Sequence, residues 1–218
     1  WDDDLATVPW DELTHLALFN ANVDTAGNLS DTNRWGDVAA AVAMAEPYGV
    51  RVHLTVTNFS TSQLEVLLGS ESARANLVDQ LAAHVQATGA HGVNIDLEGL
   101  PSSRREQMVA LTAALDDRIG EVVLATPAVD WSGAWDYSAL TDHADLFIMG
   151  YGYHWGGSTY AGPTDPLLAG DIWPKWSLSW TVDDYLANGA DPSRVILGLP
   201  LYGYRWSTAD DSVPAATT

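Results

Sequence analysis

The feature that most constrains the fold is a regular alternation of short strand-like runs with longer helical segments. The runs are apolar or rich in β-branched residues and end in turn-forming residues, which is typical of buried strands. We expect strands at 13–20, 50–57, 93–98, 121–127, 145–151 and 194–202. We expect helices at 35–48, 61–68, 71–88, about 103–119 and 177–188. This alternation predicts an α/β protein with a parallel sheet.

Periodicity does not distinguish a closed barrel from an open, doubly wound sheet. The chain has no Gly-x-Gly-x-x-Gly motif in its first βα turn and no Walker-type loop. These motifs are the strongest sequence evidence for a nucleotide-binding open sheet, so their absence disfavours that fold. Each expected strand ends in a residue that could contribute to an active site. In a barrel, the active site lies at the carboxyl-terminal face, where such strand ends meet. They are Asn20, Asn58, Glu98, Pro127, Tyr151 and Tyr202.

The size and charge of the chain limit its partners. With 218 residues and 47% hydrophobic content, we expect one domain spanning residues 1–218. The formal charge of -20 would repel a nucleic acid or an anionic membrane. The acidity fits solubility better than recognition of a cationic partner. No apolar run approaches the roughly 18 residues of a membrane span.

The chain offers no metal or cofactor motif. It has no cysteine, so it has neither disulfides nor thiolate ligands, and its six histidines form no His-Glu-x-x-His pattern. His15 and His53 alternate with apolar neighbours, which indicates core residues. No Gly-x-Ser-x-Gly elbow supports a Ser-His-Asp hydrolase.

The run Val93-Asn-Ile-Asp-Leu-Glu98 places three polar residues on one face of a strand. Its period of two points Asn94, Asp96 and Glu98 to the same side. Both faces of a parallel strand are normally buried, so paired carboxylates there suggest acid–base chemistry. We expect Glu98, nearest the strand end, to act as the acid and Asp96 to stay ionised. The alternative is a structural pair held by arginine or backbone donors.

The segment after this strand has its own signals for the start of a helix. Pro101 and the pattern Ser103-x-x-Glu106 predict a capping box. Glu98 is then not needed as a helix cap.

The strand with the three polar residues, together with other segments, resembles a known family. His91-Gly-Val-Asn-Ile-Asp-Leu-Glu98 resembles the Asp-Gly-x-Asp-x-Asp-x-Glu signature of glycoside hydrolase family 18, the chitinase-like (β/α)8 barrels. Leu13-Thr-His-Leu resembles the family's second strand, Met149-Gly-Tyr-Gly-Tyr its sixth and Leu197-Gly-Leu-Pro-Leu-Tyr-Gly its seventh. Asn94 within this signature, and the run Tyr153-His-Trp-Gly-Gly-Ser158 with Ala161-Gly-Pro163, most resemble the bacterial branch with spore-cortex and peptidoglycan N-acetylglucosaminidases.

The resemblance implies a retaining glycosidase of β-1,4-linked N-acetylglucosamine glycans, in peptidoglycan or chitin, with substrate assistance. It implies that Glu98 protonates the glycosidic oxygen while Asp96 holds the substrate's N-acetyl group. It also implies that Tyr151 donates to the acetamido oxygen and that Tyr202 lines the same subsite. From the residues alone, either tyrosine could instead be a core aromatic. A non-hydrolytic glycan-binding relative and an inactive fragment are the alternative functions.

Three positions depart from the family pattern: His91 and Asn94 replace aspartates, and Gly152 replaces an aspartate after the matched tyrosine. We expect the Asn94 amide to hydrogen-bond Asp96 without adding charge, so that Asp96 ionises more readily. If the matches to strands two, six and seven hold, the chain is a TIM barrel that lacks strands one and eight. Two exposed sheet edges would follow.

Sugar contacts are expected from aromatic loop residues and from polar strand ends. The ten tryptophans suit stacking on sugar rings, although any one of them could equally pack a loop. We select Trp155, in the long loop 152–174, and Trp131, together with Asn94, Tyr202 and Asn58. The resemblance implies an extracellular or cell-envelope location in a bacterium, with any signal segment outside this chain.

Overall fold

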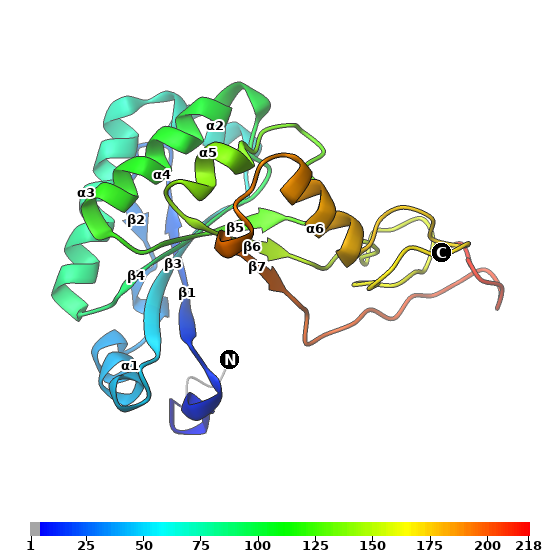
Figure 1. The fold of residues 1–218 in the computed structure, drawn as a ribbon, viewed down its shortest axis with the longest axis horizontal. Helices are drawn as coiled ribbons and strands as arrows, with labels where there is room; N and C mark the ends of the chain where they lie inside the picture. The colour runs from blue at the N-terminus through cyan, green and yellow to red at the C-terminus, as the bar shows by residue number, and fades with distance from the viewer. Residues whose placement is uncertain (1–4) are drawn as a thin grey trace.

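A computed structural model describes residues 5–218 and has a seven-stranded sheet at its centre (Figure 1). Residues 1–4, where the predicted domain begins, lie outside the described part. The strand order is β2-β1-β3-β4-β5-β6-β7, and all neighbours are parallel except β1 and β2. The strands are β1 (His15–Val23), β2 (Leu29–Ser30), β3 (Arg51–Asn58), β4 (Gly92–Leu97), β5 (Val122–Pro127), β6 (Asp145–Met149) and β7 (Val195–Gly198).

Helices connect the parallel strands, as the alternation predicts. They are α1 (Val38–Ala45), α2 (Thr61–Gly69), α3 (Glu71–Thr88), α4 (Arg105–Ile119), α5 (Tyr137–Thr141) and α6 (Leu178–Ala187). Single 3-10 turns lie at Leu5–Thr7, Trp10–Glu12, Thr32–Trp35, Glu46–Tyr48, Ser102–Arg104 and Pro192–Arg194. The bounds of α3 match the prediction, and Gly89 ends this helix in the left-handed conformation at φ 75°.

The predicted helix at 35–48 is wrong in its bounds, because the segment is divided into three pieces. Gly36 has φ 70°, which interrupts the helix after the turn at 32–35. Asp37 then caps α1 by accepting a hydrogen bond from the Ala40 amide. Pro47 falls in a separate 3-10 turn that follows α1.

The predicted capping box at Ser103 is also wrong. The Ser103 hydroxyl donates to Glu65 Oε2 on α2 at 2.6 Å, and α4 begins at Arg105 without a side-chain cap. Arg104 forms an ion pair with the same Glu65 at 2.8 Å. The Ser103 hydroxyl therefore joins the segment before α4 to α2 instead of capping α4.

The end of the last predicted strand needs correction, and one short strand was not predicted. The last strand ends at Gly198 and not at residue 202, because pairing with β6 stops at Met149 and Pro200 has no amide to donate. The turn at 24–28 is followed by the short strand β2, which pairs antiparallel with the end of β1. Two residues are too few for a period of two to be recognised.

The two faces of the sheet differ in character. One face carries residues with no exposed surface that pack beneath the helices: Leu54, Val56, Val93, Ile95, Leu97, Leu124, Leu146 and Ile148. The opposite face carries polar side chains, among them Thr55, Thr57 and Asp96, all 5% exposed or less. The alternation predicted for β4 is therefore present, with its apolar residues in the helix-covered core.

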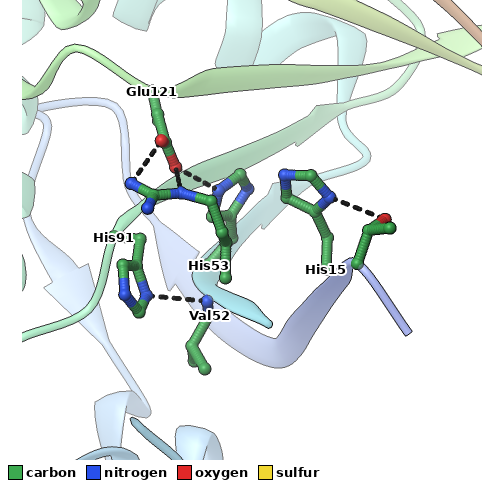
Figure 2. A network of polar contacts seen from close by, with 7 residues as sticks. His15, Val52, His53, His91 and Glu121 are labelled. Atoms are coloured by element: carbon green, nitrogen blue, oxygen red, sulfur yellow. Dashed lines mark hydrogen bonds and ion pairs between the residues drawn. The ribbon is translucent and has the colours of Figure 1, made fainter. Parts of the chain in front are cut away.

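A polar network joins the amino-terminal ends of β3, β4 and β5 (Figure 2). Glu121, just before β5, accepts from Arg51 Nε at 2.8 Å and lies 3.1 Å from His53 Nε2. His91 Nδ1 accepts from the Val52 amide at 2.9 Å. His53 is buried as predicted, whereas His15 is exposed, because β1 has few neighbours on its outer side at this end.

The sheet curls but stays open in the described part of the chain, since β1 and β7 do not pair. The loop after β6 and the carboxyl-terminal tail lie side by side beyond the sheet, joined by the Tyr160–Ala216 bridge (Figure 1). Among residues 5–218, no helix is both long and apolar enough to cross a bilayer.

Candidate active site

A cavity of about 540 Å³ opens at the carboxyl ends of β4, β5 and β6. Asp96 and Glu98 lie in its wall, and aromatic rings surround them. The aromatic lining residues are Phe19, Phe59, Trp131, Tyr151, Tyr153, Trp176, Tyr202 and Tyr204. Pockets that bind small molecules have this composition, with an apolar wall and a few convergent polar groups.

Asp96 is the most deeply buried acid of the cavity. Its side chain is on the polar face of β4, and the residue is 5% exposed. The Oδ1 atom has no hydrogen-bond partner among the described residues. Burial, and secondarily the negative charge of Glu98, raise the pKa of Asp96 to about 7. A buried acceptor without a partner is costly, so this oxygen is available to a donor from a ligand.

Glu98 stands where β4 ends. Its backbone amide donates to the Asn58 carbonyl at 3.0 Å, which continues the sheet register past Leu97. Gly99 follows at φ 76°, and a Cβ there would lie 2.8 Å from Thr61 Oγ1, so the chain turns sharply away and leaves the Glu98 side chain at the cavity. Burial raises the pKa of Glu98 as well. Burial thus favours the protonated form of both acids, and Asp96 can hold a proton near neutral pH.

The expected bond between Asn94 and Asp96 is absent from the described residues. Asn94 Nδ2 instead donates to Thr55 Oγ1 at 3.2 Å, across to the paired residue of β3. The expectation that Asp96 stays ionised is not met either, because its pKa is raised to about 7. Without that amide, burial and the charge of Glu98 determine its ionisation and favour the protonated acid.

Tyr151 and Tyr202 face each other in the wall of the cavity. Their ring centroids are 5.9 Å apart in an edge-to-face arrangement, and Tyr204 continues the row at 5.7 Å from Tyr202. Burial raises the pKa of Tyr151 to about 12, with smaller contributions from Tyr202, Asp96 and Glu98. Its hydroxyl therefore remains a hydrogen-bond donor at neutral pH.

A second aromatic group lies around the start of α6. Trp131, after β5, packs edge to face on Trp176 at 4.7 Å, and Trp176 packs on Trp180 at 4.5 Å. Trp131 is 75% exposed although it lines the cavity, so one of its faces is free for contact. The rings supply a flat apolar surface, which stacks well on sugar rings.

The structure brings five of the predicted site residues to the cavity: Asp96, Glu98, Tyr151, Tyr202 and Trp131. The described lining does not include the other three, Asn94, Asn58 and Trp155. Asn58 is buried and donates to the Val23 carbonyl and to Gln63 Oε1. Trp155 is exposed in the long loop, and its carbonyl accepts from Trp206 Nε1.

Several lining residues were not identified from the sequence, notably Trp176, Tyr153, Tyr204, Phe19 and Phe59. The alternation Tyr202-x-Tyr204-x-Trp206 could have indicated Tyr204, because alternate residues of an extended segment share a face. Phe19 and Phe59 look like ordinary strand-end apolar residues, and only the fold brings them to the cavity. Within residues 5–218, no group of three or more His, Asp or Glu side chains is arranged to hold a metal ion.

Comparison with known proteins agrees with this arrangement. The family model for glycosyl hydrolases family 18 matches residues 1–217. YdhD of Bacillus subtilis (strain 168), named as a sporulation-specific glycosylase, is 30% identical over 206 residues, which are 88% of this chain and 46% of YdhD. Its crystal structure superposes with a TM-score of 0.78 at 24% identity, covering 98% of this chain and 72% of that one.

A second solved structure holds a ligand. Catalytic domain 2 of the Group II chitinase from Ostrinia furnacalis, in an E2180L variant complexed with an N-acetylchitooligosaccharide, has a TM-score of 0.86 at 20% identity. The match covers 98% of this chain and 64% of that one. The chain spans less than half the length of the first curated relatives it matches. With the family model matching nearly every residue, the chain belongs to glycosyl hydrolases family 18.

Proposed function

We propose that this chain cleaves β-1,4 linkages of glycans that contain N-acetylglucosamine, with Glu98 as general acid and base. The observation that carries the proposal is the pair Asp96 and Glu98 in the wall of a cavity lined by aromatic rings. Both acids have raised pKa values, and Asp96 Oδ1 lacks a partner among residues 5–218. A raised pKa favours the protonated form of Glu98, and a protonated acid can donate to a leaving oxygen.

The proposed reaction is retaining and assisted by the substrate, an exception to the usual scheme of two catalytic carboxylates. Glu98 gives its proton to the glycosidic oxygen while the substrate's acetamido oxygen attacks the anomeric carbon. In the reactive state the proton of the pair is on Glu98, so the Asp96 carboxylate accepts a hydrogen bond from the acetamido N–H and stabilises the positive charge that develops there. Glu98 then takes a proton from a water molecule that opens the cyclic intermediate, which restores both acids.

Tyr151 has the position and protonation state to support this step. Its ring lines the same cavity as both acids, and its raised pKa keeps the hydroxyl protonated. The hydroxyl would donate to the acetamido oxygen as an oxyanion-hole donor does. Tyr202 and Trp131 would contact the sugar rings. Asn94 would support the site by joining β4 to β3 through Thr55, and Asn58 by joining β3 to β1 through the Val23 carbonyl. Trp155 would contact glycan only outside the cavity.

We further propose that residues 1–218 form one catalytic domain and contribute β1 and β3–β7 to a (β/α)8 barrel as strands two to seven. The parallel order of these strands and the likeness to the two superposed structures support this assignment. The substrate would be peptidoglycan or chitin. Because both polymers lie outside the cytoplasm, the proposed location is extracellular or in the cell envelope of a bacterium.

The test compares chitin oligosaccharides and purified peptidoglycan as substrates for the parent and Glu98→Gln. We expect cleavage by the parent and a loss of at least 100-fold in kcat/KM for Glu98→Gln, because that variant cannot donate the proton. Glu106→Gln, an exposed acid on α4, is the matched control and should keep the parent rate. Undiminished cleavage by Glu98→Gln would refute its role, and binding without products by the parent would favour a glycan-binding protein.

A further inference from the structure

Lys175 is the one lysine of the chain and lies beside the cavity. Its ammonium is 4.0 Å from the ring centroid of Trp176 and 5.4 Å from that of Trp180. Trp176 lines the cavity, and Lys175 is exposed. The ammonium is therefore held on the face of a cavity-lining ring and remains accessible to a ligand.

The charge of Lys175 is not neutralised by the protein. None of the ion pairs among residues 5–218 involves it, and its recorded partners are the two indole rings. Most arginines differ in this respect, because each forms an ion pair with a carboxylate: Arg34, Arg51, Arg104, Arg105 and Arg194. A cation without a partner at a cavity, in a chain of charge -20, is the unusual feature.

The position of Lys175 is fixed by the element that follows it. The Ser177 hydroxyl caps α6 by accepting from the Trp180 amide at 3.2 Å. Tyr185 of α6 donates to the Pro127 carbonyl at the end of β5 at 2.6 Å. Trp180 packs on Trp176, so the rings that hold the ammonium are anchored to the same strand end that borders the cavity.

We infer that Lys175, Trp176 and Trp131 form a subsite for a sugar that carries a carboxylate, so that the preferred substrate is an anionic N-acetylhexosamine glycan. This inference rests on the proposed function. The indole rings offer a stacking surface, and the ammonium is the partner for a carboxylate substituent at the ring edge. Asp96 and Glu98 repel an anionic glycan when ionised, and Lys175 offsets that repulsion at the Trp176 wall of the cavity. The lactyl ether of muramic acid has this chemistry, whereas chitin is neutral.

The experiment measures kcat/KM on glycan strands of peptidoglycan freed of peptides and on chitin oligosaccharides of matched length. The variants are Lys175→Met, which keeps an aliphatic stem over the rings, and Lys175→Arg, which keeps the charge. Arg118→Gln, in the last turn of α4, is the control for a lost surface charge. A third substrate, partly deacetylated chitosan oligosaccharide, is cationic and tests whether the acidic chain prefers a positively charged glycan.

We expect the parent to prefer the carboxylate-bearing strands. Lys175→Met should lower the ratio of the two kcat/KM values by about two- to fivefold, mainly through KM, as for an exposed charge pair. Lys175→Arg should restore the ratio, Arg118→Gln should leave it unchanged, and 0.5 M NaCl should bring the parent toward Lys175→Met.

Two results would overturn the inference while leaving the proposed function intact: an unchanged substrate ratio in Lys175→Met, or parent preference for chitin or chitosan over the carboxylate-bearing strands. If the parent cleaves none of the three substrates, the proposed function itself fails and this inference fails with it.

Discussion

Asp96 combines three properties that an ordinary buried acid does not have. It is 5% exposed, one of its oxygens lacks a partner among the described residues, and Glu98 adds a second negative charge nearby. Burial without compensating donors favours the neutral acid, which explains a pKa of about 7. The residue therefore lowers the stability of the empty protein at alkaline pH, as expected for a site organised to bind a ligand.

We predict that Asp96→Asn stabilises the fold, and more so at pH 8 than at pH 5.5. The folded pKa lies above the ordinary value of 3.8, so ionisation of Asp96 costs stability increasingly as the pH rises from about 4 to about 7, and the cost levels off above that. The gain in unfolding free energy should grow by about 1–2 kcal/mol between the two pH values. Urea denaturation measures it, with Asp117→Asn on α4 as an exposed control. A gain that is equal at both pH values would contradict the assignment.

The same pair sets the expected pH dependence of activity. Asp96 and Glu98 both have raised pKa values, so the pair loses its last proton as the pH rises through about 7. We predict that kcat/KM for a chitin oligosaccharide falls on the alkaline side with a midpoint near that pH, since Glu98 must be protonated to act as the acid. Rates that stay level up to pH 9 would show that neither carboxyl donates the proton.

At this scale, the sequence predicts where the acids point but not how they ionise. The period of two in the strand is enough to place Asp96 and Glu98 on one face. Their pKa values depend on burial and, for Asp96, on the charge of Glu98, while the Asn94 amide bonds Thr55 of the neighbouring strand instead of Asp96. A contact between residues 39 positions apart has no local signal in the sequence.

At the scale of elements, Glu121 links strands that do not pair with each other. It precedes β5 and reaches Arg51 and His53 on β3, although β4 lies between them. Gly92 of β4 makes this possible, because a Cβ there would lie 3.0 Å from His53 Nε2 and 2.5 Å from the Glu121 carbonyl oxygen. Figure 2 shows the dashed contacts that start from the Glu121 carboxylate. The network thus fastens the amino-terminal ends of three strands while the cavity occupies the other end.

We predict that Glu121→Gln lowers the unfolding free energy by about 1 kcal/mol, a modest value because the carboxylate is partly exposed. Burial lowers the pKa of His53. Burial acts to raise the pKa of Glu121, but the hydrogen bonds and charges of Arg51 and His53 outweigh it and lower that pKa. Both shifts make the unfolded state bind more protons, so the parent loses stability as the pH falls below about 6.5. Glu121 raises the pKa of His53 against the effect of burial, so its removal lowers that pKa further. Thermal denaturation should therefore show a steeper loss of stability just below pH 6.5 in Glu121→Gln than in Glu106→Gln. Identical pH dependence would exclude the network as its source.

Element boundaries follow from the sequence where local chemistry decides them. α3 begins at a serine cap and ends at Gly89, and both features are visible in the sequence. The prediction of a boundary fails where tertiary contacts determine it, as when Ser103 bonds Glu65 instead of capping α4. The predicted end of β7 is wrong for a similar reason, because it depends on where backbone pairing with β6 stops.

At the scale of the whole molecule, the open sheet leaves unpaired backbone along β7 and along the first half of β1. Apolar side chains near these edges are exposed, including Phe19, Ile196 and Leu199. The alternation of strands and helices predicts the parallel order, and the family resemblance predicts the missing closure. The lining of the cavity was harder to predict, because Phe19, Phe59 and Trp176 come from distant segments.

We predict that the 218-residue chain self-associates at high concentration through these edges. Ile196→Lys, which places a charge on β7, should weaken the association severalfold, measured by sedimentation velocity. Leu186→Lys is the control, because it charges an exposed apolar residue of α6 away from the strand edge. A chain that stays monomeric at all concentrations would show that the edges are not available for pairing.

The most direct test of substrate-assisted cleavage at Asp96 and Glu98 is proton NMR of the products formed in the first minutes of chitin oligosaccharide hydrolysis. The account predicts that the new reducing ends appear first as the β-anomer and then equilibrate, because two displacements at one carbon retain its configuration. Glu98→Gln should give no anomeric signal above background. Initial formation of the α-anomer would contradict the mechanism, since it requires direct attack of water opposite the leaving group.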